Sequence, residues 1–235
     1  MPSRQKCIEL SLHDKTQTLS RALWLPYVCP FIVFIVLTIP ASYFPEETHL
    51  LYILKTLAVG GLLWYWRGSY AMDIAPRLST AGYLAAVGAG LLVLPAWILP
   101  EAFFPQLGAE AGFNPYSFGL PGAAVPALIG VRLAGAVLVV PVMEEVFWRS
   151  FVLRYLVHPN FSKVPLGTFT WFSFIAVVVL FGVEHHRWLQ GMFAGFVYTL
   201  LVVQQKSLRG CILAHATTNL GLGIYVAATQ NWIFW

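Results

Sequence analysis

The sequence predicts an all-α fold, a polytopic transmembrane helical bundle of about seven to eight helices. Of the 235 residues, 58% are hydrophobic and only 10% are charged, whereas a soluble globular domain carries about 25% charged residues. The apolar residues form successive stretches of the roughly 17–25 residues that a helix needs to cross a bilayer. Because hydrocarbon offers no partner for backbone N–H and C=O groups, each spanning stretch has to be helical.

Seven stretches are expected to be spans, and residues 1–21, which are polar and basic, are expected to form a cytoplasmic N-terminal segment. Residues 22–235 then form one transmembrane domain, with a motif-bearing core at about residues 123–229. The expected spans are approximately Ala22–Phe44, Leu50–Trp66, Gly82–Leu99, Ala123–Val140 running on toward Val157, Pro165–Val183, Trp188–Val203 and Leu208–Thr229.

Basic residues alternate between the connections, and this predicts the orientation. Lysine and arginine occur in the N-terminal segment, in the connections after the second and fourth spans and in the one before the seventh. Loops 45–49 and 100–122 carry glutamates instead, and only Arg187 breaks the alternation. Because basic loops stay in the cytoplasm, we expect an inward N-terminus and an outward C-terminus. The net charge is +4, and the basic residues occur singly between apolar stretches, which excludes a nucleic-acid-binding face.

Two adjacent glutamates, Glu144 and Glu145, lie within or at the edge of the fourth stretch. An ionisable side chain inside a bilayer costs at least ~2.5 kcal/mol and usually faces a polar cavity or an opposite charge. On a helix, Glu145 and Arg149 are i,i+4 neighbours that can form an ion pair. Glu144 lies about 100° around the same helix and is left available for chemistry. The alternative is an ordinary helix end where these charges meet lipid headgroups.

Two histidine motifs follow in the second half of the chain. Phe181, Glu184, His185 and His186 close the fifth stretch, where the alternative is a pair of ordinary loop histidines. His215 and Asn219 share one face of the last stretch, and because buried polar groups need partners, that face has to point into the bundle. A polar packing pair is the alternative for these two residues.

The three motifs together carry the side chains that hydrolysis needs. A carboxylate beside a neutral histidine can act as a general base on water. An asparagine and a second histidine can donate hydrogen bonds to a developing oxyanion.

The ordered motifs resemble the CAAX-protease and bacteriocin-processing family of intramembrane proteases. Its signature is a Glu-Glu pair with Arg four residues later, then Phe-xxx-His and His-xxx-Asn, here Glu144-Glu145…Arg149, Phe181…His185 and His215…Asn219. The resemblance extends from about Val140 to Ala227. The segment from residues 148–156 through the ending at 231–235 looks like a narrower bacterial branch, the CAAX prenyl protease-related proteins associated with exosortase and PEP-CTERM sorting systems.

The resemblance implies a glutamic-type peptidase of the bacterial inner membrane that uses no cofactor and forms no acyl-enzyme. Glu144 with His185 would activate water, and His215 with Asn219 would stabilise the oxyanion. Glu145 would join this catalytic set and, with Arg149 and Phe181, shape the site. The implied partners are the lipid bilayer, a membrane-anchored peptide or protein cut near its anchor or C-terminal tail, and an exosortase-type sorting system.

The predicted span boundaries leave one conflict. They place Glu144 near the inner end of the fourth span and His185 near the outer end of the fifth. The two side chains can meet only if the fourth span runs on to about Val157, or if the fifth span is tilted or short.

Two other functions fit the same residues. Glu144, His185 and His215 could supply a zinc site, although there is no His-Glu-xx-His motif. A non-catalytic scaffold or sorting partner could keep the fold and bind peptide tails. A transporter is disfavoured because no pair of broken, repeat-related helices appears.

Overall fold

The structure, a computed structural model, describes residues 23–108 and 112–235, so the predicted N-terminal segment 1–21 lies outside the described residues. The described residues are helical and contain no strand, which confirms the all-α helical bundle. The first helix is Leu23–Ser42. Its last turn is η1, Ile39–Ser42. The other helices and short 3₁₀ and π turns are η2 Pro45–Glu47, α2 Thr48–Tyr65, α3 Ala71–Ile74, α4 Thr80–Ile98, η3 Leu99–Ala102, η4 Pro115–Phe118, α5 Ala124–Ala134, η5 Gly135–Val139, α6 Val140–Glu145, η6 Val146–Val152, α7 Leu153–Tyr155, η7 Phe161–Lys163, α8 Trp171–Val183, α9 Trp188–Gln205, α10 Leu208–Thr229 and η8 Trp232–Phe234.

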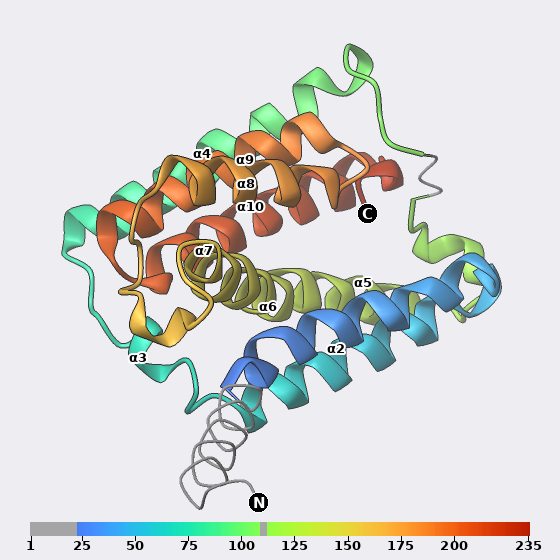
Figure 1. Cartoon of the computed structure of the whole chain (residues 1–235). Coiled ribbons are helices and arrows are strands. Elements are labelled where there is room, and N and C mark those ends of the chain that lie inside the picture. Colours follow the sequence, from blue (N-terminus) through green and yellow to red (C-terminus); the bar gives the residue numbers. More distant parts are fainter. Residues whose placement is uncertain (1–22, 109–111) are drawn as a thin grey trace, which may run out of the picture.

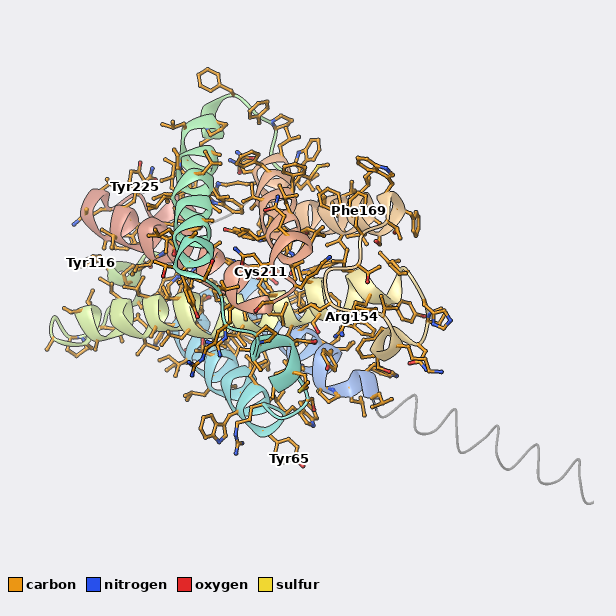
Figure 2. All side chains as sticks on the ribbon, turned by 90° about the vertical axis from the view of Figure 1, so that its left-hand side faces the viewer. Tyr65, Tyr116, Arg154, Phe169, Cys211 and Tyr225 are labelled. Atoms are coloured by element: carbon orange, nitrogen blue, oxygen red, sulfur yellow. The ribbon has the colours of Figure 1, made fainter. Side chains whose placement is uncertain are left out.

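Four helices in the described residues are long and apolar enough to cross a membrane, and they coincide with the first, third, fourth and seventh predicted spans. They are Leu23–Ser42, Thr80–Glu101, Ala124–Tyr155 and Leu208–Thr229. Helix α8 is apolar but has only 13 residues. Figure 2 shows side chains such as Tyr65 and Phe169 pointing away from the bundle, and both are exposed. Exposed apolar surface of this extent is typical of a protein surrounded by lipid.

The bundle is built around one long helix, Ala124–Tyr155, made of α5, η5, α6, η6 and α7. Figure 1 shows the first helix and α2 on one side of it, and α4, α8, α9 and α10 on the other. Phe31 of the first helix stacks on Phe147 with ring centroids 3.9 Å apart. Helix α10 packs against α4, α9 and the η5–α6 part of the long helix, so the last apolar stretch lies inside the bundle.

Two π turns, η5 and η6, flank the glutamate pair in the long helix. Pro141 has no N–H, and its ring collides with the carbonyl of the preceding turn in an ordinary α-helix. The helix widens before it, and Val140 donates to the carbonyl of Gly135, five residues back. The next carbonyl, that of Ala136, would then pair with position 141, where the proline has no hydrogen to give. Single π turns of this kind are frequent at functional sites.

The fourth predicted span does run on, to Tyr155, and this places Glu144 well inside a 32-residue helix. The fifth predicted span was wrong at its start, because α8 begins at Trp171 rather than at Pro165. The backbone turns at Gly167, whose φ is 71°, and the Thr170 hydroxyl accepts a hydrogen bond from the Ser173 N–H as the helix cap. Both features that could reconcile the depths of Glu144 and His185 are therefore present.

Gly90 sets how closely α4 approaches α10, and it gives a direct test of the packing. A Cβ atom at Gly90 would collide with the carbonyl oxygen of Ala214. We expect Gly90→Ala to lower the free energy of unfolding by about 1–3 kcal/mol, the usual cost of overpacking. Gly88→Ala on the same helix, where a Cβ meets nothing within 4 Å, should be neutral or slightly stabilising. Thermal unfolding in detergent distinguishes the two variants, and equal melting temperatures would contradict the close approach.

Candidate active site

Glu145 is fully buried and is held by two side chains. The Arg149 Nη1 lies 3.1 Å from its Oε1, which confirms the predicted i,i+4 ion pair. The Nδ1 of His215, on α10, lies 3.0 Å from the same oxygen. A hydrogen bond to a carboxylate requires that this nitrogen donate, so the proton of a neutral His215 sits on Nδ1. Glu145 thus joins the long helix to α10 at the centre of the bundle.

Arg149 is also fully buried and reaches the neighbouring helices. Its Nε and Nη2 donate, each at 3.4 Å, to the Thr199 hydroxyl and to the carbonyl of Gly195, both on α9. Its guanidinium carbon lies 4.2 Å from the centre of the Phe181 ring on α8. One arginine therefore fixes three helices around Glu145, which fits the site-shaping role expected of Arg149 and Phe181.

Glu144 is buried but is not neutralised in the way Glu145 is. Its exposed fraction is 5%, and its Oε2 lies 4.0 Å from the Nε2 of His215. That oxygen has no hydrogen-bond partner among the described residues. A buried polar atom without a partner requires an explanation, and here it leaves one carboxylate oxygen available to a reacting group.

His215 is held by a stacked tyrosine as well as by its hydrogen bond to Glu145. Tyr198 of α9 stacks on the imidazole at 5.0 Å between centroids. The Tyr198 hydroxyl donates to Thr218 at 2.7 Å, and the Thr218 hydroxyl donates to the carbonyl of Gly90 at 2.9 Å. With Nδ1 on Glu145, the Nε2 atom points toward Glu144 and can donate to an oxyanion only when the ring is protonated.

His185 lies in the short connection between α8 and α9, outside the spanning helices. Its Nδ1 is 2.8 Å from the carbonyl of Phe181, so it donates there, and the Nε2 of the neutral ring is a proton acceptor. Its imidazole packs edge-on against Trp97 of α4 at 5.4 Å. Burial lowers the pKa of His185 to about 4, so this ring is neutral at pH 7.

Asn219 faces the long helix at the first π turn. Its Nδ2 donates at 2.8 Å to the carbonyl of Ala136, the group that Pro141 leaves without a backbone partner. An amide nitrogen carries two hydrogens, so one remains for a second acceptor. His215 and Asn219 thus both point at the long helix, as their shared face predicts, but each binds a different residue of it.

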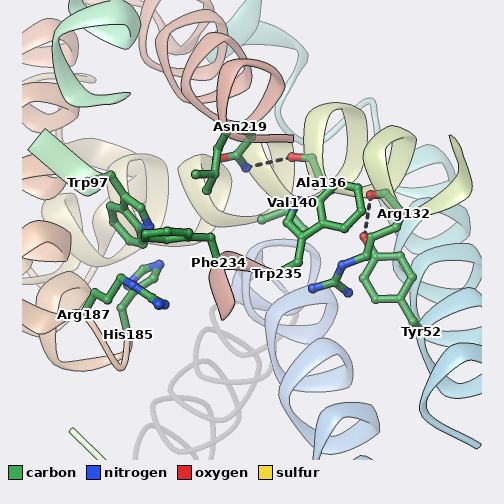
Figure 3. A pocket seen from close by; sticks show the side chains of 11 residues that line it. Tyr52, Trp97, Arg132, Ala136, Val140, His185, Arg187, Asn219, Phe234 and Trp235 are labelled. Atoms are coloured by element: carbon green, nitrogen blue, oxygen red, sulfur yellow. Dashed lines mark hydrogen bonds between the residues drawn. The ribbon is translucent and has the colours of Figure 1, made fainter. Parts of the chain in front are cut away.

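A cavity of about 250 Å³ opens beside these residues and is lined by both His185 and Asn219. Figure 3 shows His185 with Trp97 on one side and Asn219 with Ala136 on another. Val140, one turn before Glu144, also lines it, but Glu144 itself does not. The remaining lining residues are Tyr52, Arg132, Arg187, Leu222, Phe234 and Trp235.

The structure therefore gathers the predicted residues into two adjoining groups. Glu144, Glu145, Arg149 and His215 make direct contacts, whereas His185 and Asn219 face the cavity. The Phe181 ring lies between the histidines, 4.9 Å from the His185 ring and 6.3 Å from the His215 ring. Within the described part of the chain, no hydrogen bond joins Glu144 directly to His185. His186 is exposed and binds the carbonyl of Leu107 instead.

Three further residues of this site had no role assigned from the sequence. Tyr198 supports His215, and Trp148 donates from Nε1 to the carboxylate of Glu184 at 2.8 Å. Glu184 belongs to the histidine motif quoted from the sequence, and its position directly before His185 was the available signal. Among residues 23–108 and 112–235, no group of three or more His, Cys, Asp or Glu side chains is arranged to hold a metal ion.

Comparison with known families agrees with the geometry. Residues 126–221 match the family model described as Type II CAAX prenyl endopeptidase Rce1-like. This segment is less than half of the chain, but it contains every candidate site residue from Glu144 to Asn219. Comparisons with curated proteins and with solved structures gave no match. The part of the chain that carries the candidate site is therefore similar to this endopeptidase family.

Proposed function

We propose that the protein is an intramembrane endopeptidase that hydrolyses a peptide bond near a membrane anchor or C-terminal tail, with a water activated by Glu144 and His185. The observation that carries the proposal is the division of labour between adjacent carboxylates. The Oε1 of Glu145 is bound by Arg149 and by His215, whereas the nearest ionisable partner printed for Glu144 is the His215 Nε2, 4.0 Å from its Oε2. That Oε2, like the Oε2 of Glu145, is buried without a hydrogen-bond partner among the described residues. Such an oxygen, inside a lipid-spanning helix, is suited to accept a proton from water.

The other residues have matching roles in the proposal. The Nδ1 of the neutral His185 donates to the carbonyl of Phe181. Its Nε2 accepts a hydrogen bond from the water, on the side of the water that faces the cavity. His215, through its Nε2, and Asn219, through its second amide hydrogen, stabilise the oxyanion that forms on the attacked carbonyl. The Phe181 ring, between the two histidines, keeps bulk solvent away, which strengthens each of these interactions.

We also propose the orientation predicted from the basic residues, with the N-terminus in the cytoplasm of a bacterial cell. Basic residues of the predicted cytoplasmic side lie close together in the structure, which supports this orientation. Arg154 pairs with Asp73 at 2.7 Å and Arg209 donates to the carbonyl of Ile74, and both partners belong to the connection after α2. Arg187, the exception in the sequence, pairs at 2.6 Å with Glu101 of the acidic loop. A membrane-impermeant thiol reagent applied to intact cells should label a cysteine introduced at exposed Glu47 and not one at exposed Arg77.

The experiment that tests the proposal compares the termini of membrane proteins in three strains: one with the protein, one without it, and one carrying Glu144→Gln. A peptidase predicts specific new termini in the first strain alone. The same termini in the Glu144→Gln strain would instead support a non-catalytic scaffold that recruits another protease. An association with an exosortase-type sorting system predicts that the affected proteins carry C-terminal sorting signals.

Metal removal should leave the activity intact. The candidate residues are not arranged as a group of three metal-binding side chains within the described residues, and the proposed chemistry uses carboxyl and imidazole groups. Purified protein in lipid vesicles should cleave its substrate at an unchanged rate after dialysis against a strong chelator. Loss of cleavage that is reversed by added zinc would favour the zinc peptidase.

A further inference from the structure

Glu184 is a third carboxylate of the site, and the reaction as proposed so far does not use it. It caps the end of α8 directly before His185 and is partly buried. The Trp148 indole, which is itself buried, donates to it at 2.8 Å. Trp148 lies four residues after Glu144, so both side chains project from the same side of the long helix. The indole therefore holds Glu184 on the side where Glu144 lies.

The charges of Glu184 and Glu144 act on each other. Glu184 is held by the Trp148 indole, one turn after Glu144, so two groups of like charge lie on the same side of the long helix and repel each other. Arg149 attracts both groups, but its hydrogen bonds go to Glu145, Thr199 and Gly195. Two carboxylates that repel each other at a site shielded from water do not both ionise easily, and one of them can keep a proton.

Proton balance shows what a second carboxyl group can do. Burial raises the pKa of Glu184 to about 7, against the opposing effects of the Trp148 N–H and of Arg149. A carboxyl group with a pKa in this range can be protonated at neutral pH and can act as a general acid. Hydrolysis of a peptide bond needs such an acid, because the leaving nitrogen has to take up a proton as its bond to carbon breaks.

We propose that Glu184 is a further catalytic residue, which shares one proton with Glu144 and donates it to the leaving amine. This inference rests on the proposed function. Glu144 takes a proton from water as the water oxygen bonds to the carbonyl carbon. The carbon–nitrogen bond then breaks, its electron pair goes to nitrogen, and nitrogen takes the proton of Glu184. Glu144 now holds the proton, and one transfer between the two carboxyl groups restores the starting state.

The test measures turnover and its pH dependence for Glu184→Gln in the full-length protein, reconstituted in lipid vesicles. The probe is a lipid-anchored fluorogenic peptide that carries the sequence around a bond identified by the comparison of termini. Glutamine still accepts the indole hydrogen bond but cannot give up a proton. We expect kcat to fall about 10²-fold, and the loss of rate above pH 7, where Glu184 loses its proton, to disappear.

The pH profile separates Glu184 from the titratable groups around it. Those groups are Glu144, Glu145 and Arg149 on the long helix, His215 on α10, and His185 and His186 in its own connection. Glu184→Asp keeps a carboxyl group and should retain partial turnover with the alkaline limb. The matched control is Glu47→Gln, an exposed glutamate far from the site in the sequence, which should behave as the wild type does.

Each outcome decides the inference. Wild-type turnover and pH profile in Glu184→Gln would overturn it. A lower rate with an unchanged alkaline limb would also overturn it, because that result would give Glu184 only a structural role. Full turnover in Glu144→Gln would overturn the proposed function itself, so the two failures are distinguishable. If Glu184→Gln does not fold, Glu184→Asp decides between the two roles. An alkaline limb that is retained but moves to another pH supports the inference, and a limb that stays at the wild-type pH overturns it.

Discussion

Replacing Glu144 with glutamine should lower turnover about 10²–10⁴-fold, the contribution usual for a general base, and leave folding intact. Glutamine has nearly the same shape, and the Glu144 Oε2 has no hydrogen-bond partner to lose among the described residues. The measurement is cleavage of the lipid-anchored fluorogenic peptide by purified protein, together with the melting temperature of the same sample.

Glu145→Gln is the matched control, because it changes the neighbouring residue in the same way. This variant weakens the ion pair with Arg149 and the hydrogen bond with His215, so it should lose stability as well as activity. A Glu144→Gln protein that melts far below the wild type, or that turns over as fast, would contradict the separation of roles between the two glutamates.

Replacing Arg149 with alanine should have the largest effect on stability. The substitution leaves the fully buried Glu145 without its cation, and breaking a buried pair in this way costs about 3–5 kcal/mol. It also removes the hydrogen bonds to Thr199 and Gly195 and opens space beside Phe181. We expect a lower yield of folded protein and a much lower melting temperature, along with a loss of activity.

Arg77→Ala serves as the control for Arg149→Ala. Arg77 is exposed, and surface substitutions of this kind usually stay within about 0.5 kcal/mol. Arg149→Lys keeps the charge but loses the planar fork that reaches three groups, so its melting temperature should lie between those of the wild type and the alanine variant. If Arg149→Ala has the same melting temperature as Arg77→Ala, the ion pair between Glu145 and Arg149 does not stabilise the bundle.

The helices and the Glu145–Arg149 pair were predictable from the sequence because both depend on short spacings. Apolar stretch length determines where a helix crosses a bilayer, and a separation of four residues places two side chains on one helical face. The conflict between the depths of Glu144 and His185 was also visible. Two features that the sequence suggests only weakly bear on this conflict, the continuation of the long helix to Tyr155 and the late start of α8.

The partners of the polar side chains could not be predicted in the same way. Pro141 predicts a disturbance in the helix, because proline has no N–H to donate. The carbonyl of Ala136, which loses its backbone partner in this way, is instead bound by Asn219, 83 residues away in the sequence. Glu184 stood next to His185 in the sequence, yet its contact with Trp148 depends on how the connection between α8 and α9 packs on the long helix. Such contacts follow from tertiary packing and leave no local pattern.

The central claim is that Glu144 and His185 act on the same water, although no hydrogen bond joins them directly in the described structure. The most direct test is a double-mutant cycle on kcat with Glu144→Gln, His185→Ala and the variant that carries both changes. Groups that act as a unit give strongly non-additive losses, so the double variant should be no slower than the slower single variant. Full turnover in either single variant, or losses that multiply in the double variant, would contradict the mechanism.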